Sequence, residues 1–164
     1  MRKFIISIDA GTTSNRSILF DLKGKPVFSS QKEFTQYFPK SGWVEHDPDE
    51  IWRTTVKTLK DVIQKAKKLR GKILNIGITN QRETTVLWDK RTGKPVYNAI
   101  VWQDRRQEEF CAKLRKQNKD TMIFNKTGLL IDSYFSGTKI KWILDNVPKA
   151  KKLMKSNQLL FGTI

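Results

Sequence analysis

The chain has 164 residues, 38% of them hydrophobic and 10% aromatic, which is enough to build the core of one domain of ordinary size. Its net charge of +16 raises the question of nucleic-acid binding, but the basic runs carry no zinc-ligand pattern and no interleaved aromatic residues. Cys111 has no partner for a disulfide, and Ser7 and Asp9 interrupt the apolar run near the N-terminus. We therefore expect a folded cytoplasmic protein with no membrane span and no nucleic-acid partner.

A strand that opens into a polar turn is predicted at the N-terminus. The apolar run 4–8 stops at Asp9, and Gly11 begins a stretch rich in hydroxyl groups. Glycine lets the backbone approach a phosphate closely, and a carboxylate beside phosphates would require an intervening Mg²⁺. The residues with side-chain donors for phosphate are Thr12, Thr13, Ser14 and Arg16. The alternative is an ordinary hairpin turn without a ligand.

Strands and helices alternate along the rest of the chain. Strands are predicted at 17–21, 27–34, 73–79, 84–88, 99–102 and from 159, and helices at 48–69, 105–117 and 136–146. The run 73–79 is almost continuously apolar, which is typical of a strand covered on both faces. In the first helix, the predicted core-facing residues are Trp52, Val56, Leu59, Ile63 and Ala66. The basic segment 149–155, after Pro148, is predicted to be an exposed connection.

Polar and aromatic side chains follow the predicted strands, where ligand sites of open α/β sheets lie. Arg82 and Glu83 come after the strand at 73–79 and offer donors and an acceptor for the hydroxyl groups of a polyol. Trp102 ends the strand at 99–102 and could place an apolar face against a small substrate. Tyr134 precedes the last helix and carries a hydroxyl group. The alternatives are a structural ion pair for Arg82 and Glu83 and core positions for Trp102 and Tyr134.

Five segments occur in the order found in the glycerol kinases of the FGGY carbohydrate kinase family, which the chain resembles from about residue 4 to 164. They are DAGTTSNR at 9–16, GWVEHDP at 42–48, GITNQRETT at 77–85, NAIVWQDRR at 98–106 and YFSGTK at 134–139. The QRETT and YFSGTK segments separate this group from kinases of pentoses and gluconate. The resemblance implies an α/β domain of the actin-like ATPase (ribonuclease H-like) fold, with a mixed sheet flanked by helices.

The same resemblance implies a site and a reaction. The reaction is phosphorylation of glycerol to sn-glycerol 3-phosphate, with ATP and Mg²⁺ as cofactors and glycerol and ATP or ADP as partners; homo-oligomers of the full-length enzyme are compatible with it. It places Thr12, Thr13, Ser14 and Arg16 at the nucleotide phosphates, Asp9 at the metal, and Arg82, Glu83, Trp102 and Tyr134 at glycerol.

The resemblance also implies that residues 1–164 are part of an N-terminal domain, incomplete at its C-terminus. The family's general-base Asp and the C-terminal ATP-binding domain lie beyond Ile164, so no catalytic base is expected in this chain. We expect the chain alone to be inactive and to be part of a longer enzyme. The alternatives are a kinase of another polyol or sugar in the family and a non-catalytic binding module that keeps the fold.

Overall fold

A computed structural model describes all 164 residues, which form two compact units. Unit 1 contains Met1–Gln36 and His46–Gln81, and unit 2 contains Tyr37–Glu45 and Arg82–Ile164. Each unit is described by itself below.

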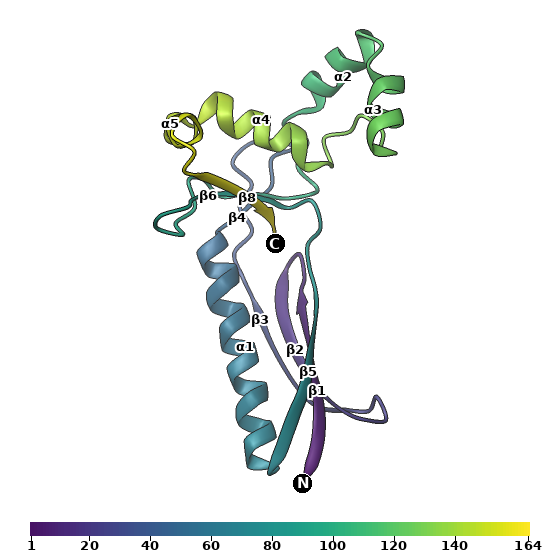
Figure 1. The fold of residues 1–164 in the computed structure, drawn as a ribbon, viewed down its shortest axis with the longest axis vertical. Coiled ribbons are helices and arrows are strands. Elements are labelled where there is room, and N and C mark those ends of the chain that lie inside the picture. The colour runs from purple at the N-terminus through teal and green to yellow at the C-terminus, as the bar shows by residue number, and fades with distance from the viewer. The chain divides into compact units, whose positions relative to one another are not determined.

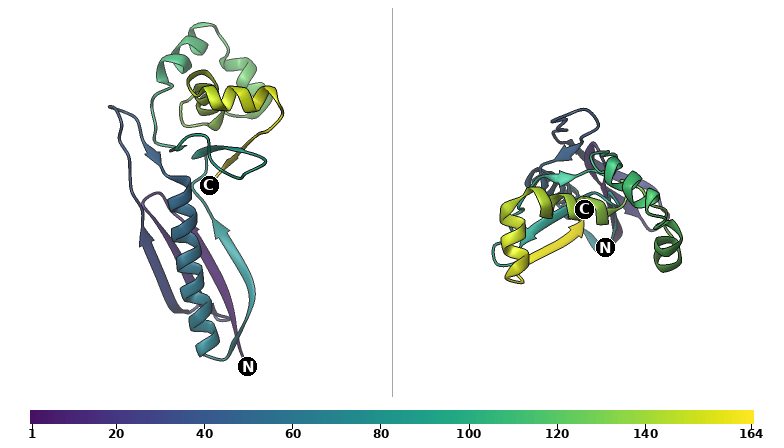
Figure 2. Two further views of the ribbon diagram at one scale, coloured as in Figure 1. Left: turned by 90° about the vertical axis from the view of Figure 1, so that its left-hand side faces the viewer. Right: turned by 90° about the horizontal axis from the view of Figure 1, so that it is seen from above.

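A four-stranded mixed sheet and one long helix make up unit 1 (Figure 1). The sheet has the strand order β3-β2-β1-β5. β1 (Arg2–Ala10) is antiparallel to β2 (Ser14–Asp21), β2 is antiparallel to β3 (Pro26–Glu33), and β1 is parallel to β5 (Gly71–Thr79). The helix α1 (Pro48–Lys68) runs along these strands, as Figure 1 and the left panel of Figure 2 both show. The strand, turn and returning strand expected at the N-terminus are confirmed.

The core of unit 1 follows from the two-residue period of β1. Phe4, Ile6 and Ile8 alternate along the strand and are all buried on one face. They pack with Leu19 of β2 and with apolar residues of α1. The sheet therefore buries one stripe of side chains beneath the helix.

The helix α1 starts as the sequence predicts, and three of its five expected core-facing residues lie in the core: Ala66 is buried, and Leu59 and Ile63 pack against the buried cluster. Asp47 caps the helix by accepting a hydrogen bond from the Asp49 amide, and a proline occupies the first turn. Trp52, expected in the core, is 68% exposed. The buried residues of the helix are Ile51, Thr58, Val62 and Ala66. Thr58 shares a hydrogen bond of 3.0 Å with Ser17 of β2. Because this buried position of the helix is polar, a search for apolar residues at helical spacing does not find it.

The connection from α1 to β5 is tight. Arg70, and not the glycine after it, takes the left-handed conformation with a φ of 51°. Gly71 serves a different purpose, because a Cβ atom at this position would lie only 2.1 Å from the ring of Phe4. Gly71 thus marks a close approach between β5 and the Phe4 side chain.

The expectation that β5 is covered on both faces is wrong for this chain. Leu74, Ile76 and Ile78 are 40%, 49% and 73% exposed. β5 is the last strand of its sheet and pairs only with β1, so it lacks a neighbour on its other side.

Unit 2 contains a second four-stranded sheet, with the order β4-β7-β6-β8, and four helices. Its strands are β4 (Glu45–His46), where the chain passes between the units, β6 (Thr85–Asp89), β7 (Ala99–Ile100) and β8 (Leu159–Thr163). Its helices are α2 (Glu108–Lys116), α3 (Asp120–Thr127), α4 (Ser136–Asn146) and α5 (Pro148–Lys155). α4 and α5 pack against β6, and Leu87, Ile100, Ile143 and Ala150 form the core.

Three elements of unit 2 depart from the sequence prediction. The segment expected to be an exposed connection is the helix α5, which starts at Pro148 and buries Ala150 and Leu153. α3 was not expected. The strand at 99–102 stops at Ile100, and the following helix begins only at Glu108, because a turn closed by Asp104 lies between them. None of the helices has the length and apolar character that crossing a membrane would require.

Candidate functional site

The predicted phosphate-binding residues lie at the turn between β1 and β2, where Thr12 and Thr13 belong to the turn and Ser14 and Arg16 to the start of β2. The turn is closed by a hydrogen bond of 3.1 Å from the Gly11 amide to the Ser14 carbonyl oxygen. A Cβ atom at Gly11 would lie 2.9 Å from that oxygen, so this turn needs glycine. Thr13 and Arg16 are exposed, and Thr12 and Ser14 are half-buried. The arrangement leaves donors at the surface of the turn, as the sequence predicts, while their role toward a nucleotide stays a prediction.

A buried polar chain supports this turn from within unit 1. The Gln36 amide nitrogen donates to the carbonyl oxygens of Thr12 and Phe34, at 3.2 and 3.3 Å. The amide oxygen of Gln36 lies 2.7 Å from Nε2 of His46, so this nitrogen carries a proton and donates it to Gln36. Burial lowers the pKa of His46 to about 4, and the charge of Glu50 offsets part of that effect. His46 thus holds the turn in place through Gln36, a role that the sequence did not reveal.

Asp9 was predicted to support a metal ion. One of its oxygens, Oδ2, accepts a hydrogen bond of 3.1 Å from Arg16, and the other has no partner within the chain. The chain has no group of three or more metal-ligating side chains. A Mg²⁺ bound to nucleotide needs only one or two carboxylates, because phosphates and water supply its other ligands. The single half-exposed carboxylate of Asp9 therefore fits such an ion.

The residues predicted to bind a polyol all belong to unit 2, and the structure brings three of them together. Glu83 precedes β6, and Tyr134 precedes α4. Oε2 of Glu83 accepts hydrogen bonds from the amide and the hydroxyl group of Ser136, at 2.8 and 2.6 Å, so the carboxylate caps the start of α4. The rings of Trp102 and Tyr134 meet edge to face with their centroids 5.9 Å apart. Arg82 is exposed beside Glu83.

Backbone strain marks this site. Glu83 has a φ of 66°, in the left-handed region that residues other than glycine rarely adopt. Such a conformation costs about 1–3 kcal/mol and persists only when the surroundings enforce it. The two hydrogen bonds from Ser136 supply that constraint.

A buried ion cluster fixes the segment that carries Trp102. The side chain of Arg106 is completely buried and bonds to both Asp104 and Glu45 at 2.8 Å. Its guanidinium lies 3.9 Å from the centre of the Trp43 ring and 4.5 Å from that of Trp142. Asp104 also accepts hydrogen bonds from the backbone amides of Val44 and Arg106. These contacts close the turn that follows β7, directly after Trp102.

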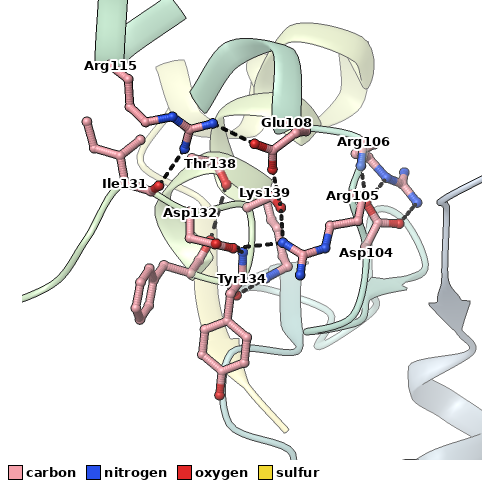
Figure 3. Close-up of polar contacts among 12 residues, drawn as sticks. Asp104, Arg105, Arg106, Glu108, Arg115, Ile131, Asp132, Tyr134, Thr138 and Lys139 are labelled. Carbon is pink, nitrogen blue, oxygen red and sulfur yellow. Dashed lines mark hydrogen bonds and ion pairs between the residues drawn. The ribbon is translucent and has the colours of Figure 1, made fainter. Parts of the chain in front are cut away.

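Tyr134 projects from a loop that is held at successive residues (Figure 3). Arg115 donates to the Ile131 carbonyl oxygen, and Arg105 bonds to Asp132. Lys139 donates to the Tyr134 carbonyl oxygen. The tyrosine ring points away from this polar network, so the backbone is held while the side chain remains available.

Three polar groups of the site have no partner within the chain. They are the guanidinium of Arg82, Oε1 of Glu83 and the hydroxyl group of Tyr134. A cation, a carboxylate oxygen and a phenol beside an indole ring can bind the hydroxyl groups and the carbon face of a small polyol.

The sequence indicates the candidate ligand-binding residues but not the residues that position them. Ser136 and Lys139 fall within the quoted YFSGTK segment, yet no sequence pattern connects Ser136 with Glu83 or Lys139 with the Tyr134 backbone. His46 and Cys111 were assigned no chemistry. Cys111 is buried, which raises the pKa of its thiol.

Comparisons with known proteins agree with this architecture. Residues 4–164 match the N-terminal domain of the FGGY family of carbohydrate kinases. The chain is 57% identical over 164 residues to the glycerol kinase of Petrotoga mobilis and 59% identical over 163 residues to that of Malacoplasma penetrans. These matches cover 100% and 99% of this chain but 33% and 32% of the relatives, so the chain spans about a third of their length.

Solved structures give the same relationship. The crystal structure of Plasmodium falciparum glycerol kinase with ADP has a TM-score of 0.91 at 37% identity, over 99% of this chain and 32% of that one. Gluconate kinase from Lactobacillus acidophilus has a TM-score of 0.81 at 26% identity, over 98% of this chain and 31% of that one. The fold is thus the mixed α/β, actin-like ATPase fold of the N-terminal domain of these kinases. The chain belongs to the FGGY family of carbohydrate kinases.

Proposed function

We propose that this chain is the N-terminal part of a kinase that transfers a phosphoryl group from ATP to glycerol and forms sn-glycerol 3-phosphate. In this proposal, the residues Thr12, Thr13, Ser14 and Arg16 bind the nucleotide phosphates and Asp9 supports Mg²⁺. Arg82, Glu83, Trp102 and Tyr134 bind glycerol.

One observation carries the proposal. The unpaired groups of Arg82, Glu83 and Tyr134 lie on QRETT and YFSGTK, two of the segments by which the chain resembles glycerol kinases. Identity to the glycerol kinases of Petrotoga mobilis and Malacoplasma penetrans, at 57% and 59%, is about twice the 26% found for a gluconate kinase. Both facts support glycerol over a larger sugar or sugar acid.

The proposal assigns the general base to a part of the enzyme that this chain does not match. Asp104 and Asp132 are the candidate bases in unit 2, and both are already engaged. Asp104 is 2% exposed and accepts from Arg106 and the Val44 amide. Oδ1 of Asp132 accepts from Arg105 and from the Tyr134 amide. Asp104 is buried within its ion cluster, and neither residue matches the general base of the family, so we expect no turnover by the chain alone.

A chimera tests the proposal. In it, this chain replaces the matching third of Petrotoga mobilis glycerol kinase, and a coupled assay follows glycerol 3-phosphate formation with MgATP. We expect saturable activity from the chimera and none above background from the 164-residue chain. A folded chimera that does not use glycerol would refute the proposal for this chain.

Two alternatives give different results in the same assay. A kinase of another substrate would prefer gluconate, xylulose or another polyol over glycerol in a panel run with the chimera. A non-catalytic binding module would leave the chimera inactive on every substrate, while glycerol would still bind to it in calorimetry.

A further inference from the structure

Lys139 of α4 is a lysine that the fold buries almost completely, with 1% of its surface exposed. Its ammonium group donates to the Tyr134 carbonyl oxygen, lies 5.8 Å from the centre of the same tyrosine ring and forms no ion pair. A buried charge without a carboxylate partner is costly, and an apolar side chain would serve packing better. This position therefore calls for an explanation beyond packing.

The explanation lies in the loop that Lys139 contacts. The other polar side chains that contact this loop, Arg105, Glu108 and Arg115, are all partly exposed. Lys139 alone reaches it from the interior, and it reaches the residue that presents the free phenol (Figure 3).

Lys139 and Glu83 form hydrogen bonds to the residues on either side of Phe135. Glu83 accepts from the amide and the hydroxyl group of Ser136, while Lys139 donates to the carbonyl oxygen of Tyr134. Burial is the main cause that lowers the pKa of Lys139 to about 8, and the charges of Glu83, Asp104 and Asp132 offset part of that effect while the charge of Arg105 adds to it. The ammonium group is thus bound to the backbone of the residue that carries the unpaired phenol.

We propose that Lys139 is a positioning residue of the glycerol site, which fixes the direction of the Tyr134 phenol by holding the backbone of that residue. The proposal rests on the proposed function for its kinetic consequences. Loss of the amine would leave a buried carbonyl group unsatisfied and free the peptide unit after Tyr134 to rotate. The phosphate turn of unit 1 would be unaffected.

Kinetics of the chimera described above test this role. We expect Lys139→Met, which keeps the length of the side chain but removes the donor, to raise the KM for glycerol about tenfold or more. The KM for ATP should stay within about twofold. Lys139→Gln keeps a donor and should show a smaller defect. Lys141→Met is the matched control, because Lys141 lies on the same helix, is half-exposed and pairs with Asp145.

Nuclear Overhauser contacts in the 164-residue chain provide an independent measurement. The contact between the Trp102 and Tyr134 rings should weaken in Lys139→Met and persist in Lys141→Met. If the chimera fails to use glycerol at all, the proposed function fails and this contact alone decides the role of Lys139.

Three outcomes would overturn the proposal. The first is an unchanged KM for glycerol in a folded Lys139→Met variant, or, in an inactive chimera, a ring contact that persists. The second is an equal rise in both KM values, which indicates a general structural defect. The third is failure of both Lys139→Met and Lys139→Gln to fold, because the side chain would then serve folding as a whole.

Discussion

His46 should make unit 1 sensitive to acid. It is the only histidine of the chain, it is 0% exposed, and its Nδ1 atom is buried without a partner. Nε2 donates a hydrogen bond to the amide oxygen of Gln36. The amide nitrogen of Gln36 donates to two carbonyl oxygens, and these bonds fix the orientation of the amide group. A second proton on the imidazole would therefore have no acceptor in the folded chain.

The magnitude follows from the two pKa values. In the folded chain, burial lowers the pKa of His46 from 6.5 to about 4. The unfolded chain takes up the proton first as the pH falls, so the contribution to stability is complete above pH 6.5 and is lost toward pH 4. At about 1.4 kcal/mol for each pH unit, the loss amounts to about 3 kcal/mol.

Urea unfolding between pH 7 and pH 4, followed by circular dichroism, measures this loss. The His46→Gln variant is the reference, because its carboxylates titrate as in the original chain and their effects cancel in the difference between the two. We expect the difference in the free energy of unfolding to change by about 3 kcal/mol over this range. The ring signals of the single histidine give the pKa directly by NMR. A pKa near 6.5, or a difference that does not depend on pH, would refute the reasoning.

Three further predictions concern other residues. In the chimera, Arg82→Ala should lower kcat/KM for glycerol about 10- to 100-fold, since a lost charged hydrogen bond costs about 1.5–3 kcal/mol; an unchanged value would remove Arg82 from the site. Asp9→Asn should raise the Mg²⁺ concentration for half-maximal rate about tenfold, and an unaltered requirement would make Asp9 structural. Gly71→Ala should lower the free energy of unfolding by about 1–3 kcal/mol in urea titrations, because the added Cβ would lie 2.1 Å from the Phe4 ring. Gly77→Ala, with nothing within 4 Å, is its control, and equal stabilities would contradict this account.

Elements whose signals lie in a few neighbouring residues could be predicted from the sequence. The strand, turn and returning strand at the N-terminus follow from an apolar run, a glycine and a second apolar run. The start of α1 follows from Asp47 and the proline after it. The ends of strands also pointed to Glu83 and Trp102, because strand ends are where side chains of a sheet become available to ligands, and the role of both residues toward a ligand stays a prediction.

Elements whose signals are ambiguous were missed. Pro148 follows one helix directly and starts another, and a proline after a helix is equally typical of an exposed connection. α3 has no buried residue, so no apolar stripe marks it. For β5, a continuous apolar run predicted burial on both faces, but burial depends on which elements lie beside the strand.

The buried polar residues mark the limit of sequence reasoning here. A hydrophobic pattern predicts apolar side chains at buried positions and polar side chains at exposed positions. Thr58, His46 and Lys139 are polar and nevertheless buried. Each is buried because its hydrogen-bonding partner comes from another part of the fold or from a neighbouring turn: Ser17, Gln36 and the Tyr134 carbonyl oxygen, respectively. Periodicity measures hydrophobicity alone and carries no information about such partners. Two of the three contacts support the backbone of a proposed ligand-binding segment, so the positioning residues of a site are harder to predict from sequence than the residues that touch the ligand.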